Sequence, residues 1–584
     1  MDATNPSAQS LAWQEVPADE VGDAIVAAMA LGGIDHLFFT SGTEIGFYQE
    51  AIAKAKAHNR PAPRLISVLH EHACLNAAMG YAAVSGKPTA TAVHVDVGTQ
   101  HYGGAVHTAR HSCLPILITA GAPATAYPGS MRGAREGAHI WLQQGYDQNG
   151  IVRQYVKWDH RMALQDNPGL VVSRALQVAR SEPCGPVYLS LPREVVLNRM
   201  EGCKFPTADQ LGIPRPAAPD PDGIQEIAER LIWAKNPFVV ADCGRNPAAV
   251  TALVDLCELV GMPVIDGGMR AYQNLPLGHP LFQPTTSLKD ADVVLVLDAN
   301  VPWNPGPDAP GSNAYVAVID ADPIRLRIPI FEFTANLRLV AQCSSAIPAI
   351  AEAVRSLATT ADTQRFQERA AHWAILSRER RNKLEEEARA HETDMPIDPT
   401  WLAYQIGAIV DDNCIVCDDT THNRAAPFLL LSRPGSYFHN PGSSGGWGAG
   451  FAFGAKLAAP ERDVILVSGD GFYGFGTSKA AMWSATHYGA PFMAVIFQNR
   501  SFGTGTVGVA NVYPDGYAAR SGFDGGFFDP PVDLAKEAEA AGAYGENVRD
   551  PEQLAPALRR GLEQIRSGTP ALIAVWLPRL IYGD

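Results

Sequence analysis

Two short polar stretches end consecutive apolar strands in the C-terminal part of the chain. Gly469-Asp470-Gly471 follows an apolar strand predicted over residues 464–468, and Asn499 follows a second one predicted over residues 492–497. A carboxylate and a carboxamide at strand ends are the oxygen ligands that Mg²⁺ prefers when it carries a diphosphate. The two stretches therefore indicate a site for a metal ion and a diphosphate.

The same glycines also fit the G-x-G-x-x-G pattern of dinucleotide-binding proteins, from Gly469 to Gly474. In that pattern a pyrophosphate lies against bare backbone at a helix start, and an acidic residue about 20 positions further on binds ribose. Here Asp470 would repel a phosphate unless a cation lay between them, and no Asp or Glu occurs between Asp470 and Asp515. A nicotinamide-dependent oxidoreductase is therefore an alternative from another class, and the metal-diphosphate site is the better interpretation.

The composition is typical of a large enzyme from a reducing compartment. The chain has 584 residues and a net charge of −15, and this length predicts about three domains. It has no basic run and no apolar stretch of about 18–20 residues, so neither nucleic acid nor a membrane is an expected partner. Residues 1–16 are polar and acidic, and nine cysteines are scattered along the chain, which indicates a cytoplasmic protein.

Short apolar runs alternate with alanine-rich helical stretches throughout the chain, as at residues 115–120, 293–297 and 570–575. Continuous apolar strands between helices predict parallel sheets that are covered on both faces. We therefore expect an α/β protein with three doubly wound parallel-sheet domains. Proline-rich and charged segments predict an N-terminal domain over residues 1–204, a linker over 205–223, a central domain over 224–362, a helical connector over 363–396 and a C-terminal domain over 397–584.

The segment that begins at Gly469 resembles the thiamine diphosphate motif of the acetolactate synthase and benzoylformate decarboxylase superfamily. That motif is Gly-Asp-Gly followed, further along the chain, by Asn-Asn. The resemblance implies that Asp470 and Asn499 ligate Mg²⁺ through their side chains and Ser501 through its main-chain carbonyl. It also implies that Gly469 and Gly471 lie beside the diphosphate of the cofactor. The three domains would then be the pyrimidine-binding, central and diphosphate-binding domains of such enzymes.

The segment departs from the family motif in two ways. Gln498 stands where the family has the first Asn, and it still offers a carboxamide. The loop after the Gly-Asp-Gly stretch is longer than in benzoylformate decarboxylase, and Phe472 stands where a small residue usually lies near the phosphate.

Two more elements of the C-terminal third correspond to the diphosphate side of the family's site. Thr421 and His422 stand in a polar strand-end loop and are candidate phosphate donors. Gly445 and Gly446 belong to a glycine-rich turn into a helix, where backbone can approach a cofactor closely. The family places a bulky aliphatic side chain, which wedges the cofactor into its bent shape, at the position of Gly445. The wedge would therefore come from elsewhere, with Trp447 as the candidate, unless the alignment is shifted by one residue.

Glu71 begins a stretch of small residues that predicts a closely packed helix and ends in Gly80-Tyr81-Ala82. A carboxylate at a helix start is favoured by the helix dipole whatever its role. The family has His-Glu or Gln-Glu at the same spacing before Gly-Tyr-Ala. The resemblance implies that Glu71 hydrogen-bonds the aminopyrimidine ring of the cofactor and activates it.

His94 stands between a predicted strand and a Gly-Thr turn into a helix. An isolated histidine is often structural, but imidazole is also suited to proton transfer near neutral pH. The segment resembles benzoylformate decarboxylase, which places His94 at its catalytic histidine, His101 at an Asn and Thr43 at its substrate-binding Ser. The second active-site histidine of that enzyme falls near Pro305 and is absent here, so Trp303 is expected to shape the pocket instead.

Together these matches imply an enzyme that uses thiamine diphosphate and Mg²⁺ to cleave or form a carbon–carbon bond next to a carbonyl group. A 2-oxo acid decarboxylase or carboligase, similar to acetolactate synthase, is the first expectation for a small-molecule carbonyl substrate. A 2-hydroxyacyl-CoA lyase is the alternative within the family, and a non-catalytic protein that kept the fold is a further one. In this family Glu71 and Asp470 face one another across a subunit interface, so a homodimer or homotetramer is expected.

Overall fold

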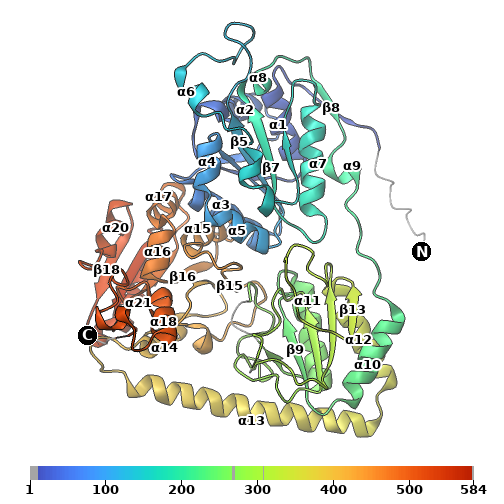
Figure 1. Cartoon of the computed structure of the whole chain (residues 1–584), viewed down its shortest axis with the longest axis vertical. Helices are drawn as coiled ribbons and strands as arrows, with labels where there is room; N and C mark the ends of the chain where they lie inside the picture. Colours follow the sequence, from blue (N-terminus) through green and yellow to red (C-terminus); the bar gives the residue numbers. More distant parts are fainter. Residues whose placement is uncertain (1–10, 266–269, 307, 582–584) are drawn as a thin grey trace. The chain divides into compact units, whose positions relative to one another are not determined.

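The computed structural model describes residues 11–265, 270–306 and 308–581, and its strands form three parallel sheets and one antiparallel pair (Figure 1). The antiparallel pair joins β1 (Gln14–Val16) to β8 (Cys203–Phe205). Helices separate consecutive strands of the large sheets, as the alternating sequence pattern predicts. The predicted α/β class with three parallel sheets is confirmed.

The N-terminal sheet has the strand order β3-β2-β4-β5-β7-β6, and all neighbours are parallel. The chain leaves β2 for β3 on one side and then returns to β4 on the other. The carboxyl ends of β2 and β4 therefore form the switch point at which open α/β sheets bind ligands. The strands are β2 (His36–Phe39), β3 (Arg64–Ser67), β4 (Thr89–Val93), β5 (Ile116–Ala122), β6 (Asp159–Arg161) and β7 (Val187–Pro192).

Helices cover this sheet and carry several of the predicted site residues. α1 packs against α2 and α7, and α3 packs against α5, β2 and β4. Among the described residues the helices here are α1 (Val21–Leu31), α2 (Phe47–Ala57), α3 (Glu71–Ser85), α4 (Asp96–His101), α5 (Gly104–His111), α6 (Ala138–Leu142), α7 (Pro168–Arg180), α8 (Arg193–Val196) and α9 (Ala208–Leu211), with the short 3₁₀ helices η1 (Thr43–Ile45), η2 (Asn149–Ile151) and η3 (Arg153–Tyr155).

The central sheet has the order β10-β9-β11-β12-β13 and is also parallel. A single long helix, α13 (Thr360–Ala390), follows it in the chain (Figure 1). The elements are β9 (Pro237–Ala241), β10 (Val264–Ile265), β11 (Val293–Leu297), β12 (Tyr315–Asp320), β13 (Leu337–Val340), α10 (Pro221–Trp233), α11 (Pro247–Val260) and α12 (Cys343–Leu357).

The C-terminal sheet has the order β15-β14-β16-β17-β19-β18, so the carboxyl ends of β14 and β16 form a second switch point. β14 is buried along its whole length, and Cys414 and Cys417 lie in this core strand. The elements are β14 (Cys414–Asp419), β15 (Tyr437–His439), β16 (Asp463–Gly469), β17 (Met493–Gln498), β18 (Tyr544–Val548), β19 (Ala571–Trp576), α14 (Pro399–Ile409), η4 (Ala426–Phe428), α15 (Gly448–Ala458), α16 (Asp470–Phe475), α17 (Ser478–Tyr488), α18 (Gly503–Val512), α19 (Tyr517–Arg520), α20 (Leu534–Ala540) and α21 (Pro551–Arg566).

The chain groups into two compact units. One unit contains the residues up to Arg215 together with residues 449–459 and 476–484, and the other contains the remainder. α15 therefore belongs to the unit of the N-terminal sheet, although the sequence places it in the C-terminal third. Residues 212–220, inside the predicted linker, form no helix or strand.

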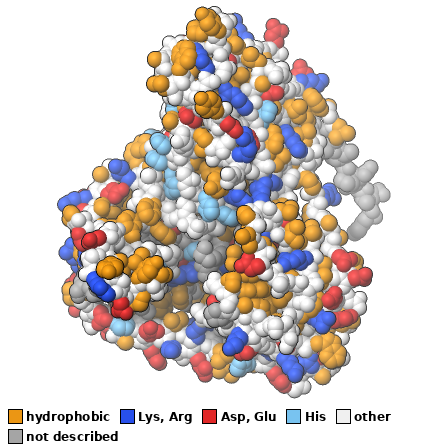
Figure 2. Space-filling view, in the orientation of Figure 1, with side chains coloured by type: hydrophobic (Ala, Val, Ile, Leu, Met, Phe, Trp, Pro, Cys, Tyr) orange, Lys and Arg blue, Asp and Glu red, His pale blue; other side chains and the backbone are white. Residues whose placement is uncertain are grey.

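Positive and negative side chains are interspersed over the face of the molecule seen in Figure 2. Within the described residues, every helix is either too short or too polar to span a bilayer.

Candidate active site

A pocket of about 300 Å³ lies at the carboxyl ends of β14, β16 and β17. The parallel order of these strands brings their ends to one edge, so residues far apart in the sequence line a common wall. The predicted site residues that the pocket gathers are Thr421, His422, Gly469, Asp470, Gly471, Asn499 and Ser501.

Asp470 is the first residue of α16 and is 7% exposed. Its Oδ2 accepts a hydrogen bond from the backbone N–H of Arg500 at 2.6 Å, and its Oδ1 accepts one from Gly471 at 2.8 Å. Burial raises the pKa of this carboxyl group to about 7, against the lowering effect of the backbone hydrogen bonds. A carboxylate in such a place gains from a cation beside it.

The turn after β17 is held by its own polar groups. Oδ1 of Asn499 accepts from the N–H of Ser501 at 3.0 Å, and the Ser501 hydroxyl donates to the Asn499 carbonyl at 2.9 Å. Arg500, between them, has a φ of 56°, in the left-handed region that costs energy for a side chain with a Cβ. The set of carboxylate, carboxamide and carbonyl oxygens fits a hard cation such as Mg²⁺.

Asp419, at the end of β14, holds the glycine-rich turn before α15. Its Oδ2 accepts hydrogen bonds from the N–H groups of Gly446 and Gly448 at 3.1 and 3.0 Å, and its Oδ1 accepts one from Asn440. Gly446 has a φ of 94°, which a residue with a side chain adopts only with strain. Burial raises the pKa of Asp419, which is 1% exposed. Asp419 directly precedes the loop of Thr421 and His422, and its residue type alone does not indicate this role.

Phe472 and Gly445, two positions at which the chain departs from the family, meet in the folded chain. A Cβ built on Gly445 would lie 2.3 Å from the Phe472 ring, so that ring fills the space which a side chain at position 445 would take. Phe472 lines the 300 Å³ pocket, whereas Gly445, Gly446 and Trp447 are not among its lining residues. Trp447, the predicted wedge, is 2% exposed.

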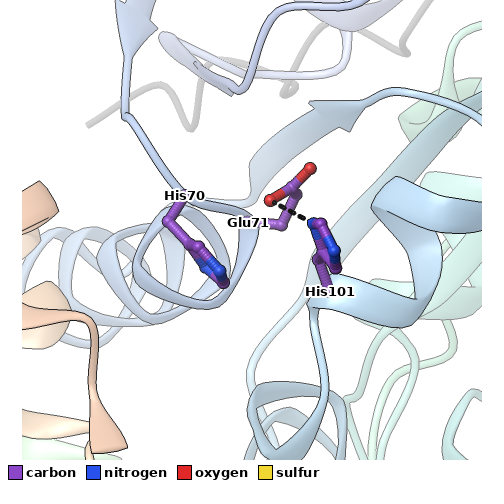
Figure 3. Close-up of side chains that lie close together, drawn as sticks. All are labelled: His70, Glu71 and His101. Carbon is purple, nitrogen blue, oxygen red and sulfur yellow. Dashed lines mark hydrogen bonds and ion pairs between the residues drawn. The ribbon is translucent and has the colours of Figure 1, made fainter. Parts of the chain in front are cut away.

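Glu71 is the first residue of α3, as predicted, and is 8% exposed. His70 caps the helix, because its Nδ1 accepts a hydrogen bond from the N–H of His72 at 3.1 Å. Oε2 of Glu71 lies 3.3 Å from Nδ1 of His101, and the rings of His70 and His101 stack with their centroids 5.5 Å apart (Figure 3). The predicted pocket residue His101 is therefore brought to Glu71.

His94 follows β4 and lies against the loop after β2, at the switch point of the N-terminal sheet. Its Nδ1 lies 2.8 Å from Oε2 of Glu44, and its Nε2 lies 2.8 Å from Nε2 of Gln143. The Thr43 hydroxyl donates to the same Glu44 oxygen at 2.7 Å. A Cβ on Gly42 would lie 2.6 Å from His94, so the ring occupies space that only glycine leaves free.

Trp303 lies in the central domain. It lines a pocket of about 390 Å³ together with Arg270, whose guanidinium donates to the carbonyls of Val301 and Pro302 at 2.8 and 3.0 Å. Its indole meets Phe333 edge to face, with the ring centroids 5.5 Å apart.

Comparison with known families matches both ends of the chain. Residues 19–151 match "Thiamine pyrophosphate enzyme, N-terminal TPP binding domain", and residues 418–575 match "Thiamine pyrophosphate enzyme, C-terminal TPP binding domain". The chain belongs to the thiamine pyrophosphate enzymes. Thiamine pyrophosphate, the cofactor of this family, is another name for thiamine diphosphate, so the predicted family is confirmed.

Relatives of this thiamine pyrophosphate enzyme align over nearly their whole length. A benzoylformate decarboxylase of Pseudomonas aeruginosa is 28% identical over 88% of this chain and 91% of its own. A probable acetolactate synthase of Mycobacterium bovis is 26% identical over 95% of each chain. A sulfoacetaldehyde acetyltransferase of Castellaniella defragrans is 24% identical over 93% of this chain and 90% of its own.

A solved structure supports the fold. The thiamine diphosphate-dependent 4-hydroxybenzoylformate decarboxylase of Rhodococcus jostii superposes with a TM-score of 0.75 at 22% identity, over 96% of this chain and 99% of that one. The chain is thus a thiamine diphosphate-dependent carbon–carbon lyase or transferase of the decarboxylase and acetolactate synthase type, as the sequence predicts.

Proposed function

We propose that this enzyme holds thiamine diphosphate through Mg²⁺ and decarboxylates a 2-oxo acid or joins it to a second carbonyl compound. The observation that carries the proposal is the pocket in which Asp470, Asn499 and Ser501 meet at the ends of two neighbouring strands. Their oxygen atoms suit Mg²⁺, and backbone N–H groups at the start of α16 suit the negative charge of a diphosphate.

The remaining pocket residues have assigned roles in this proposal. Thr421 and His422 would donate hydrogen bonds to diphosphate oxygens, since both residues line the same pocket as Asn499. Phe472 would support the cofactor from the place that a side chain at position 445 fills in the family. Its ring is held there because Gly445 leaves the space open.

When bound, thiamine diphosphate supplies a nucleophilic carbon and an electron sink for the bond that breaks. Glu71 would hold the aminopyrimidine ring by a hydrogen bond, and His101 keeps the Glu71 carboxylate in place from 3.3 Å. His94 would carry a proton to or from the reacting carbon or oxygen at its Nε2. CO₂ leaves the 2-oxo acid in both outcomes. The proposed proton transfer by His94 and the benzoylformate decarboxylase relative favour protonation and release of an aldehyde over transfer to a second carbonyl compound.

The proposal includes a homodimer or homotetramer in which Glu71 of one subunit faces Asp470 of another. This arrangement follows the family resemblance, and its test is the subunit mixing described in the Discussion.

The experiment is calorimetric titration of metal-stripped protein with thiamine diphosphate, with and without Mg²⁺. We expect binding that requires Mg²⁺ and that Asp470→Ala weakens at least tenfold, since a single ligand loss removes roughly 1.4 kcal/mol or more. Asp255→Ala, which removes an exposed carboxylate from α11, is the matched control and should bind as the wild type does.

Turnover then identifies the substrate class. The loaded enzyme is tested with aromatic and aliphatic 2-oxo acids for release of CO₂ and aldehyde. Binding of the cofactor without any release from 2-oxo acids would reject the decarboxylase proposal, and Mg²⁺-independent binding would reject the metal site.

A further inference from the structure

A buried carboxylate lies behind the histidine that the proposed function uses. Glu44 is 2% exposed and stands in η1, directly after the loop that follows β2. Carboxylates are almost never this buried unless they are paired. Its Oε2 lies 2.8 Å from Nδ1 of His94, which follows β4, so the pair joins the two strand ends at the switch point of the sheet.

The backbone around the pair leaves little freedom of movement. A Cβ on Gly42 would lie 2.6 Å from the imidazole, and a Cβ on Gly121 of β5 would lie 2.6 Å from Cβ of Glu44. Both side chains are therefore packed directly on glycine backbone. Such support holds a functional group within the small tolerance that proton transfer requires.

The charge of Glu44 depends on its neighbours. Burial raises the pKa of Glu44, but the contacts with His94 and with the Thr43 hydroxyl together lower it by more. The pKa therefore lies below its usual value. The carboxyl group is thus ionised at neutral pH. Both partners act on Oε2, whereas the buried Oε1 accepts no hydrogen bond within the described part of the chain.

Nδ1 of His94 lies 2.8 Å from this carboxylate without an aligned hydrogen bond. Since an ionised carboxylate only accepts hydrogen bonds, turning the ring into line forms one when Nδ1 carries the hydrogen. The neutral ring then has its lone pair on Nε2, where the side-chain amide of Gln143 donates to it at 2.8 Å. The Gln143 amide is oriented with its NH₂ group towards the ring, because a lone pair on Nε2 requires a donor there. The contact on one ring nitrogen thereby decides the function of the other.

We propose that Glu44 is a positioning residue for His94: it fixes the ring with Nε2 as the basic atom and stabilises the imidazolium that forms when Nε2 takes a proton. Gln143, at the end of α6, covers Nε2 until a substrate group replaces its amide. A buried carboxylate behind an imidazole has this effect in hydrolases of unrelated fold. The inference rests on the proposed role of His94 and adds Glu44 and Gln143 to it.

In a purely structural role, Glu44 would only connect the loop after β2 to the loop after β4. A double-mutant cycle on the holoenzyme separates the two roles. We expect Glu44→Gln to lower kcat roughly ten- to hundredfold with little change in KM, and Glu44→Asp to recover part of the loss. In a His94→Ala background Glu44→Gln should change kcat less than about twofold, because its effect passes through the imidazole. Equal losses in both backgrounds would overturn the proposal.

A second measurement needs no turnover. Diethyl pyrocarbonate acylates unprotonated imidazole nitrogen, and peptide mass spectrometry follows the reaction at His94, with the exposed His58 as internal reference. Gln143→Ala should raise the rate at His94 several-fold, because it uncovers Nε2. Glu44→Gln should lower the rate, since a carboxamide also permits the tautomer with hydrogen on Nε2.

The two measurements keep the inference separate from the proposed function. If the wild type turns over no 2-oxo acid but the labelling rates change as stated, the Glu44–His94 pair stands and the substrate proposal fails. If turnover occurs and neither the cycle nor the labelling responds as stated, the pair is structural and the inference is wrong.

Discussion

The contact between α3 and α15 offers the sharpest test of how this structure is held together. Both helices belong to the same compact unit, although their sequences lie far apart. A Cβ on Gly454 of α15 would lie 1.9 Å from the carbonyl oxygen of Ala77 on α3, and a Cβ on Gly80 would lie 2.0 Å from the carbonyl oxygen of Phe451. The backbones are therefore in direct contact, and Gly454→Ala is the perturbation.

The magnitude follows from the distances. A Cβ needs about 3.0 Å from such an atom, so the helices must separate locally by roughly 1 Å. Overpacking of this kind costs about 1–3 kcal/mol, while alanine in a helix gains about 0.5–1 kcal/mol over glycine. The central values, about 2 and about 0.75 kcal/mol, leave a net loss of about 1 kcal/mol, which corresponds to a fall in apparent Tm of about 2–4 °C for a unit of about 150–250 residues.

The assay is thermal unfolding with amide hydrogen exchange, because a chain of this size need not unfold in one step. Exchange should accelerate in residues 71–85, the helix that α15 contacts. Gly508→Ala is the control, since a Cβ there meets no atom within 4 Å and α18 should be unchanged or slightly more stable. If Gly454→Ala were as stable as this control, the close contact of α3 with α15 would be refuted.

Three further predictions follow from the site and its surroundings. Gly445→Leu should weaken thiamine diphosphate binding at least tenfold, because the new side chain clashes with the Phe472 ring. Adding Phe472→Gly to the same chain should restore the affinity, measured by calorimetric titration, to within about threefold of the wild type. If the affinity is not restored, the Phe472 ring does not take the place of a side chain at position 445. Burial lowers the pKa of His36 from 6.5 to about 4. Between these values the unfolded chain binds a proton that the folded chain does not, so the stability of the fold decreases as the pH drops from 6.5 towards 4. The Tm of His36→Gln should therefore decrease less between pH 7.5 and 5.0 than the Tm of the wild type. Mixing inactive Glu71→Gln and Asp470→Ala subunits under exchange should recover about a quarter of wild-type activity if each site uses both subunits, and none if each site lies within one chain.

The sequence alone determined the elements whose evidence is local. Gly469-Asp470-Gly471 and Asn499 each follow an apolar strand, and consecutive parallel strands end at the same edge of a sheet. Their approach in one pocket could therefore be predicted without a structure. Glu71 was equally accessible, because a carboxylate before a run of small residues marks a helix start. The alternation of apolar strands and helices likewise sufficed to predict the α/β class.

Only the tertiary structure decided which side chains meet across the sheet. Glu44 lies beside His94 because β3 is added on one side of β2 and β4 on the other, and no local pattern encodes that order. Gln143 comes from a segment after β5 and carries no signal that links it to His94.

The place of Phe472 over Gly445 could also not be predicted from the sequence, in which the two residues are separate departures and Trp447 is the candidate wedge unless the alignment is shifted by one residue. A large ring and a missing side chain compensate only when packing brings them together, and packing depends on the whole fold. The local sequence therefore determines which functional residues stand at the strand ends. Strand order and close packing determine which side chains orient those residues.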